Sequence, residues 1–508
     1  MDLSKEAKKR KIKYFLISYV DFFGVLRSKL VPAGSIKEMQ KEGAGFAGFS
    51  TYLDMSPSDP DMAAIPDPKS LIQLPWQPDV GWLAGDLWMN GKPVASSPRV
   101  MLRNQIDKLA KKNMHLKSGV ECEYFLITPD GSSIADQNDI ADKPCYDQSA
   151  LMRQYDLIKA ICDSMIMLGW GPYQNDHEDA NGQFEMNWDF SDVLVTADRH
   201  AFFKFMVKSI AEKHDLRATF MPKPFSHLTG NGCHMHLSIW NSNGAKNLFL
   251  DKKGELGLSK MAYNFLGGLI QNAIGMCAIT NPTVNSYKRI NSPVTSSGAT
   301  WSPNTVTYGG NNRTHMVRIP GPGRLEFRLA DGAANPYLMS AAILAAGLEG
   351  VKNNIDPGKR LDIDMYSESD KAKGAKKLPL YLIDSIREFS KNKVMRSYLG
   401  EEFFNAYLKN HDYSDWTYLQ DGPFDSIEEF ECWLKQAIKG NDPVFYAIID
   451  LKTEKAVGIC AYLRIQPLVG VIELGKIHFS TLLKKTTSIV FFTDISLIQY
   501  NKSLPIAG

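Results

Sequence analysis

The amino-acid sequence predicts a mixed α+β protein of several domains. The chain has 508 residues, and domains usually hold roughly 100 to 200 residues each. Between about residues 100 and 415, stretches with apolar residues at helical spacing alternate with strand-like runs. The composition, 44% hydrophobic and 22% charged, is typical of globular proteins. Disordered and fibrous proteins are therefore excluded.

Residues 1–95 are expected to form a small β-rich domain. The strand-like runs 13–20 and 24–31 are bounded by turn signals such as Pro32-Ala33-Gly34. A basic stretch precedes the first run and superficially imitates a secretion signal. Asp21 interrupts the apolar run and no small-residue cleavage site follows. We interpret this segment as a charged helix end that leads into a strand.

A second domain, residues 96–415, is expected to begin with a helix at Ser97-Pro98. Serine is a favourable N-cap, and proline is tolerated at the first helical position. Further helices are predicted over 151–168, 201–214, 260–278 and 336–352. The remaining segment, 416–508, contains three strand-like runs, at 442–452, 456–465 and 470–475.

Charge and cysteine usage narrow the classes of partner. Lys+Arg 58 against Asp+Glu 56 gives a net charge of +2, which offers no overall attraction to nucleic acid or anionic membranes. No apolar run approaches the ~20 residues of a membrane-spanning helix. The seven cysteines contain no Cys-x-x-Cys pair, so neither a disulfide framework nor a zinc finger is indicated. We expect a cytoplasmic protein with no nucleic-acid or membrane partner.

Four strand-like segments carry an unusual polar face. Successive side chains of a strand point to opposite sides, so every second residue shares an environment. The four polar sets are Glu121 and Glu123; Gln183, Glu185 and Asn187; His234, His236 and Ser238; and Arg324, Glu326 and Arg328. A single such strand is usually just half-exposed to solvent. Here lysine is absent, and carboxylates, imidazoles and guanidinium groups take its place.

If the four strands belong to one sheet, these carboxylates converge with two histidines, and Glu178 can reach the same place. Like charges a few ångströms apart repel strongly, so cations are needed among them. Oxygen ligands dominate the set, which favours Mg²⁺ or Mn²⁺ over zinc.

Arginines are the second group of residues that we assign to the predicted site. Five fall within about forty positions: Arg289, Arg313, Arg318, Arg324 and Arg328. Guanidinium groups bind phosphate and carboxylate through paired hydrogen bonds. Together with metal ions they indicate nucleotide phosphoryl transfer. No Walker-type loop is present, so the sheet face would have to hold the phosphates.

At these residues the chain resembles the glutamine synthetase family, in particular type III glutamate–ammonia ligases and γ-glutamylmethylamide synthetases. The resemblance spans about residues 10 to 415. It rests on motifs that stand in family order: residues 119–125, 177–185, 218–224, 230–236, 281–289, 312–313 and 335–338.

The resemblance implies an N-terminal β-grasp-like domain and a catalytic domain with a curved antiparallel sheet flanked by helices. It implies two or more Mg²⁺ or Mn²⁺ ions, one held by Glu123, Glu178 and Glu185 and another by Glu121, His234 and Glu326. Gly230, Arg289 and Arg328, with His234, would bind glutamate. His236, Ser238, Arg318 and Arg324 would bind ATP. Arg313, with Arg289 and Glu326, would act in catalysis, Arg313 by stabilising the transferring phosphoryl group.

The implied reaction is an ATP-dependent ligation. ATP would convert the γ-carboxylate of glutamate into a γ-glutamyl phosphate, which ammonia or an amine then attacks, expelling phosphate. The family forms double-ring dodecamers, so a homo-oligomer is expected.

Two departures from the family concern the amine. Phe46-Ala47-Gly48-Phe49-Ser50 stands where ammonium-using members have Phe-Asp-Gly-Ser-Ser, and the flap at residues 291–301 contains no acid. The site thus has fewer anions and gains Phe49 and Trp301. We hypothesise that methylamine or ethylamine competes with ammonium as acceptor.

A third departure is the tail. Its strand-like runs resemble the first half of a GNAT-type N-acetyltransferase, but the Gly-rich turn that would bind pyrophosphate is absent. Residues from Thr487 onward match neither family. We expect residues 416–508 to be non-functional, and the replaced C-terminus puts the dodecamer in question. Alternatives to the ligase are a guanidino kinase and a non-catalytic fusion pseudoenzyme.

Overall fold

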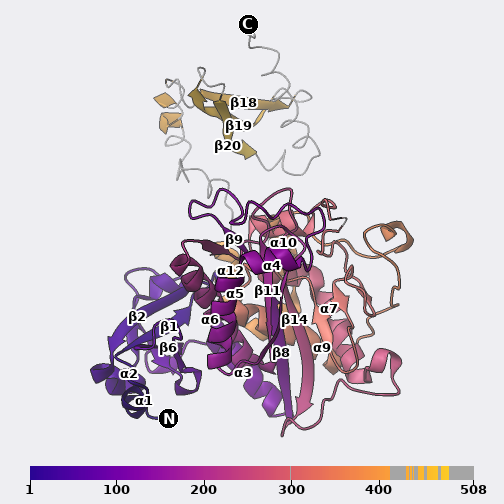
Figure 1. Cartoon of the computed structure of the whole chain (residues 1–508). Coiled ribbons are helices and arrows are strands. Elements are labelled where there is room, and N and C mark those ends of the chain that lie inside the picture. Colours follow the sequence, from indigo (N-terminus) through magenta and orange to yellow (C-terminus); the bar gives the residue numbers. More distant parts are fainter. Residues whose placement is uncertain are drawn as a thin grey trace. The chain divides into compact units, whose positions relative to one another are not determined.

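A computed structural model describes residues 1–297, 299–411, 431–433, 435–436, 439, 444–450, 455–466 and 471–479. The chain divides into two compact units, Met1–Lys409 and Asn410–Gly508. The first unit contains all helices that the sequence predicts and three of the four sheets found among the described residues (Figure 1). No helix in the described part of the chain is both long enough and apolar enough to cross a membrane.

The N-terminal part of the first unit is built on a sheet with the order β2-β1-β6-β4-β3, to which β5 and β7 pair through β6. Its strands are β1 (Tyr14–Val20), β2 (Leu26–Pro32), β3 (Ala44–Phe46), β4 (Met62–Pro66), β5 (Ile72–Gln73), β6 (Val80–Met89) and β7 (Lys92–Pro93). Helices α1 (Leu3–Arg10) and α2 (Ile36–Glu42) and the short turns η1 (Ala33–Ser35), η2 (Gly48–Thr51) and η3 (Pro68–Ser70) complete it.

The basic N-terminal stretch is the end of helix α1, as the sequence predicts. Asp2 caps the helix by accepting hydrogen bonds from the backbone N–H of Ser4 and Lys5. The basic residues 8–10 lie in the last turn, where positive charge stabilises the helix dipole. Strand β1 follows after Lys13 and pairs in parallel with β6. The β-grasp class of this region stays a prediction.

The rest of the first unit contains two sheets rather than the single sheet expected. A six-stranded sheet has the order β12-β8-β14-β17-β16-β15, and a four-stranded sheet has the order β10-β11-β9-β13. The strands are β8 (Met114–Cys122), β9 (Tyr124–Ile127), β10 (Pro172–His177), β11 (Gln183–Trp188), β12 (Ser191–Asp192), β13 (Arg217–Thr219), β14 (Cys233–Asn241), β15 (Tyr308–Gly309), β16 (Val317–Arg318) and β17 (Leu325–Phe327).

The expectation of one shared sheet is therefore wrong for the strand that carries Glu185. Strands β8, β14 and β17 lie in the larger sheet, whereas β11 lies in the smaller one. The physical reason is a break at Glu123, which separates β8 from β9. Its backbone N–H still donates to Gly232 O, but Tyr124 then pairs with Phe184 of β11. One extended segment thus serves both sheets and brings their polar faces together.

Helices α3 to α6 contact the strands of these sheets, and α7, α9, α10 and α11 pack mainly on one another. The helices are α3 (Pro98–Ala110), α4 (Gln148–Arg153), α5 (Tyr155–Met167), α6 (Val193–Lys213), α7 (Lys260–Thr280), α8 (Val284–Ile290), α9 (Pro336–Asn353), α10 (Leu382–Lys391), α11 (Lys393–Leu399) and α12 (Glu401–Asn410), with η4 (Glu255–Gly257) and η5 (Ser369–Lys371). The helix predicted over 151–168 is divided at Gln154, whose φ of −102° and ψ of 14° depart from helical values.

The second unit contains an antiparallel sheet with the order β18-β19-β20. The strands β18 (Val444–Asp450), β19 (Lys455–Gln466) and β20 (Val471–Phe479) coincide with the three strand-like runs of the sequence. The resemblance to an acetyltransferase stays a prediction. The proposed boundary at 415/416 and the residues from 487 onward lie outside the described residues.

Candidate active site

Ten of the residues singled out in the sequence line one cavity of about 280 Å³, here called the carboxylate pocket. They come from both sheets and from the loops after them. They are Glu121, Glu123, Glu178, Glu185, His234, His236, Arg313, Arg318, Arg324 and Arg328. Strands that do not share a sheet therefore still bring their polar faces to one place.

Glu326, Arg289 and Gly230 lie immediately behind this lining. Glu326 is fully buried and accepts hydrogen bonds from Arg328 at 2.5 Å and Arg318 at 2.7 Å. Arg289 is buried too and donates to the carbonyl of Leu329, while its Nε has no partner. A Cβ at Gly230 would lie 2.3 Å from the carbonyl oxygen of Pro222 and 3.1 Å from Cγ of Arg289. Only glycine fits beside this arginine.

Three overlapping groups of potential metal ligands lie at the carboxylate pocket. Oxygen atoms of Glu123, Glu178 and Glu185 lie within 4.8 Å of one another, which is the first predicted ligand set. The second predicted set is divided in two: Glu121 and Glu326 group with His236, and Glu121 and Glu185 group with His234. Nδ1 of His234 lies 3.4 Å from Glu121 and 3.8 Å from Glu326.

The chemistry of these donors fits hard divalent cations. Carboxylate oxygens predominate, with imidazole as a minor contributor. Nε2 of His234 and Oδ1 of Asp176 are buried without a hydrogen-bond partner. Buried polar atoms without a partner are costly, and a cation among them would satisfy carboxylate and imidazole lone pairs alike.

Burial and nearby charges change the pKa values of the carboxyl groups in this pocket, and they do so in different directions. Burial, and then the charge of Glu123, raises the pKa of Glu178 well above its usual value. Burial and the charge of Glu121 do the same for Glu185. Burial raises the pKa of Glu123 to about 7 and that of Asp176 to about 6. Burial alone would raise the pKa of Glu326 as well, but the positive charges of Arg328, His236 and His234 together outweigh it and lower the pKa to about 2.

These pKa shifts predict that the stability of the metal-free protein, measured in a chelator, depends on pH. A carboxyl group whose folded pKa is raised stabilises the fold below its unfolded pKa, and that contribution is lost as pH rises through the folded pKa. For Asp176 and Glu123 the loss falls between about pH 4, near the unfolded pKa values, and about pH 7, the higher of the two folded values. In EDTA the melting temperature should fall across this range by on the order of 5 °C.

The matched measurement repeats the same series with saturating Mn²⁺. Cations bind the deprotonated carboxylates, so the melting temperature should rise with pH instead. If the melting temperature changed with pH in the same way in EDTA and in Mn²⁺, these carboxylates would not bind cations.

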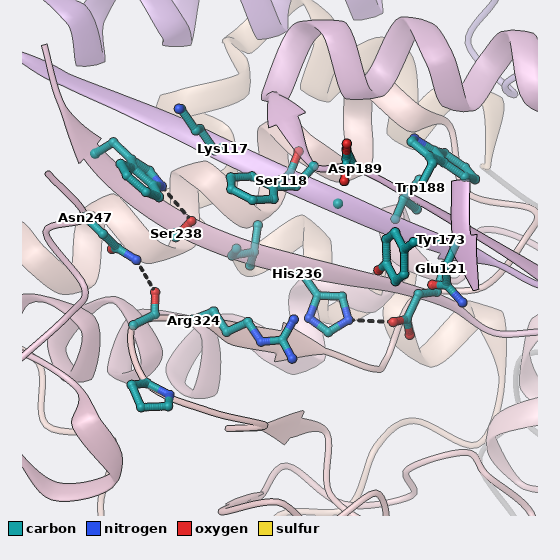
Figure 2. Close-up of a pocket in the computed structure, with 18 residues that line it drawn as sticks. Lys117, Ser118, Glu121, Tyr173, Trp188, Asp189, His236, Ser238, Asn247 and Arg324 are labelled. Atoms are coloured by element: carbon teal, nitrogen blue, oxygen red, sulfur yellow. Dashed lines mark hydrogen bonds and ion pairs between the residues drawn. The ribbon is translucent and has the colours of Figure 1, made fainter. Parts of the chain in front are cut away.

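A second cavity, of about 320 Å³, adjoins the carboxylate pocket and shares Glu121, Tyr173, Asn187, His236 and Arg324 with it. Figure 2 shows this neighbouring pocket, with His236 bonded to Glu121 at 2.8 Å where the two cavities meet. Ser238 lines its other end and accepts a hydrogen bond from Trp240 at 2.9 Å. The ring of Trp240 is stacked with that of Phe190, at 6.3 Å between centroids. An aromatic end and a charged end suit a molecule with a ring and anionic groups.

Several lining residues were not identified from the sequence. Gln174 and Asp176 line the carboxylate pocket from β10, four and two positions before Glu178 respectively. Their alternation is the same period-two signal as in the other strands. Cys145, Tyr146 and Tyr173 also line it.

The acid-free flap is held by an acid from elsewhere. Asp179, directly after Glu178, is buried and accepts hydrogen bonds from Ser297 at 2.5 Å and Thr229 at 2.7 Å. Trp301 at the end of the flap lines the carboxylate pocket, as expected. Phe49 does not line it within one chain, and this side chain is 51% exposed.

Comparisons with known proteins agree with this geometry. A family model described as glutamine synthetase, catalytic domain, matches residues 95–429. A glutamine synthetase of Rhizobium leguminosarum bv. phaseoli is 60% identical over 409 residues, which are 80% of this chain and 94% of that protein. A glutamate–methylamine ligase of Methyloversatilis universalis is 41% identical over 436 residues, covering 83% and 98%.

Two solved structures are also similar to this chain over most of its length. A chain described as a GmaS/ADP complex is 64% identical and superimposes with a TM-score of 0.78, covering 80% of this chain and 94% of that one. A GmaS without ligand is 62% identical, with a TM-score of 0.77 and the same coverage.

Proposed function

Because this chain belongs to the glutamine synthetase family and is an ATP-dependent ligase that forms γ-glutamyl amides, we propose that methylamine competes with ammonium as its acceptor. The observation that carries this proposal is the flap: it brings Trp301 to the carboxylate pocket and contributes no acid of its own. The glutamine synthetase and the glutamate–methylamine ligase both match this chain over almost their whole length, so relatedness alone does not choose between the two acceptors.

We assign the predicted ligands to two divalent ions, Mg²⁺ or Mn²⁺. Glu123, Glu178 and Glu185 would hold one ion, and Glu121 and Glu326 with the imidazoles would hold the other. When bound, such ions neutralise a triphosphate and polarise its terminal phosphoryl group.

We assign the binding of ATP and glutamate, the two other substrates, to the neighbouring pocket and the arginines. The base of ATP would occupy the aromatic end, beside Ser238, so that His236 and Arg324 meet its phosphates where the cavities join. Arg289 and Arg328, beside the glycine at 230, would bind the carboxylates of glutamate. The γ-carboxylate would then attack the terminal phosphoryl group, and Arg313 would stabilise the charge that develops.

The acceptor must lose a proton before it attacks the γ-glutamyl phosphate. An alkylammonium ion attracts anions through its N–H groups and aromatic faces through its charge. Trp301 and Tyr146 line the pocket, as does Asp176, whose Oδ1 is buried without a partner. We propose that this Oδ1 accepts the proton in place of the aspartate that the N-terminal loop lacks.

Competition between the two acceptors tests this proposal. With ATP, Mg²⁺, glutamate and equimolar ammonium and methylamine, we expect γ-glutamylmethylamide to be a major product by mass. The relevant quantity is kcat/KM for each amine. A preference for ammonium by orders of magnitude would refute methylamine as a competing acceptor.

A second prediction concerns the N-terminal loop. Ala47→Asp restores the carboxylate and should raise kcat/KM for ammonium severalfold, with less effect on methylamine. The same change at Ala245, in an exposed turn, serves as the control. No gain from Ala47→Asp would place the loop away from the acceptor.

The loop also bears on assembly. Since Phe49 is exposed and does not line the carboxylate pocket of its own chain, the loop would complete an acceptor site only in a neighbouring subunit. We therefore propose a homo-oligomer, with the double ring of the family as the reference state. A monomer by gel filtration with full amine ligation would contradict a shared site.

A further inference from the structure

Three side chains that could bind a soft metal ion lie directly behind the carboxylate pocket. Cys122 on β8, Cys233 on β14 and His200 on α6 are each no more than 1% exposed. Cys122 stands between Glu121 and Glu123, and Cys233 immediately precedes His234. Because neighbouring residues of a strand face opposite sides, the thiols point away from the pocket and toward the helix.

The register of the strands places the two thiols face to face. Cys122 and Cys233 are direct partners in the antiparallel pair β8 and β14. The backbone N–H of Cys233 donates to Ala330 O, and that of Glu123 to Gly232 O. The first bond goes to a residue outside strand β8, and the second joins the next pair of residues along the ladder. Cys122 and Cys233 therefore form a pair without hydrogen bonds between its two members. In such pairs the side chains approach more closely.

His200 completes the group from the adjacent helix. Its Nε2 lies 3.7 Å from Sγ of Cys233, and one ligand atom of each of the three residues lies within 4.8 Å of the other two. Two ligands of a tetrahedral zinc ion, with bonds of about 2.0 to 2.3 Å, are separated by roughly 3.5 to 3.8 Å. The spacing therefore suits one ion between them.

The donor set differs in kind from that of the carboxylate pocket. Thiolate and imidazole are ligands that favour zinc and other thiophilic cations over magnesium. Two thiolates balance the charge of a divalent ion, so the complex is neutral and its burial costs less than that of a bare charge. The two sites should consequently bind different metals at the same time.

We propose that Cys122, Cys233 and His200 form a thiophilic metal site, with Zn²⁺ as the natural occupant. Binding forms two Zn–S bonds and one Zn–N bond, and the two thiols release their protons to solvent. One position of a tetrahedral ion is left for a small fourth ligand such as water. An ion here would join β8, β14 and α6 behind the residues that line the carboxylate pocket, and so stabilise the strands that carry them.

Cobalt substitution tests the site without any mutation. Full-length protein, reduced and stripped of metal, is loaded with Co²⁺ in saturating Mg²⁺, which occupies the oxygen ligands. We expect one Co²⁺ per chain with a sulfur-to-cobalt charge-transfer band in the near ultraviolet, and loss of this band on addition of Zn²⁺. Cobalt at carboxylates cannot produce such a band, so its absence would overturn the proposal.

Variants show which cysteines produce the charge-transfer band. Cys122→Ser and Cys233→Ser should each abolish it or reduce it by at least half, whereas Cys162→Ser on α5 should leave it unchanged. Retention of the full band in both variants would overturn the assignment. A thiol count that falls by two in wild-type protein before any metal is added would also overturn it, because it would show a Cys122–Cys233 disulfide instead.

Discussion

Replacing Glu326 by alanine should lower kcat by at least about a hundredfold and weaken Mn²⁺ binding. Glu326 is fully buried, belongs to a ligand group with Glu121 and His236, and pairs with Arg328 and Arg318. Its loss removes a metal ligand and leaves buried guanidinium groups without their counter-charge. The measurements are steady-state kinetics with methylamine and a Mn²⁺ titration.

The control for this variant is Glu388→Ala on α10, where the side chain is 47% exposed and pairs with Lys391. It should change kcat by less than about twofold, as expected for surface ion pairs. Because Glu326→Ala also removes a buried partner of Arg328, thermal melts must show that the variant is folded at the assay temperature. Equal kinetic effects of the two variants would refute the role of Glu326.

Replacing Arg313 by lysine should lower kcat by about a hundredfold or more with little change in stability. Arg313 is exposed and lines the carboxylate pocket. Within the described part of the chain, no carboxylate forms an ion pair with it, so its charge is available to a substrate. Lysine keeps the charge but loses the planar paired donors that suit a phosphoryl group. KM for glutamate should change by only a few fold.

Arg387→Lys is the matched control, since Arg387 is 53% exposed on α10 and pairs only with Asp384 among the described residues. This change should leave both kcat and the melting temperature as they are. If Arg313→Lys instead raised KM and kept kcat, Arg313 would bind the ground state and not the transferring group.

The period of two in β-strands explains why so much of the site could be predicted. Glu121, Glu185 and His234 share a pocket because alternate residues face one way, a property visible in the sequence. The same period marks Gln174 and Asp176 ahead of Glu178, and their place in the pocket could have been found in this way.

Features that depend on long-range register could not be predicted. The division into two sheets follows from the break at Glu123, after which Tyr124 pairs with Phe184 of β11, and no local pattern reveals this change of partner. Likewise, Cys122 and Cys233 show no metal-binding spacing along the chain and meet only because β8 and β14 pair in one particular register. The support of the flap by Asp179 depends on contacts with Thr229 and Ser297, far away in sequence.

The central claim is that two divalent cations lie among these carboxylates where a triphosphate would meet glutamate. A crystal grown with Mn²⁺ and a non-hydrolysable ATP analogue tests it most directly through anomalous scattering. We expect at least two manganese peaks, one among Glu123, Glu178 and Glu185 and one beside Glu121 and Glu326. Manganese absent from the carboxylate pocket, or confined to the protein surface, would contradict the account.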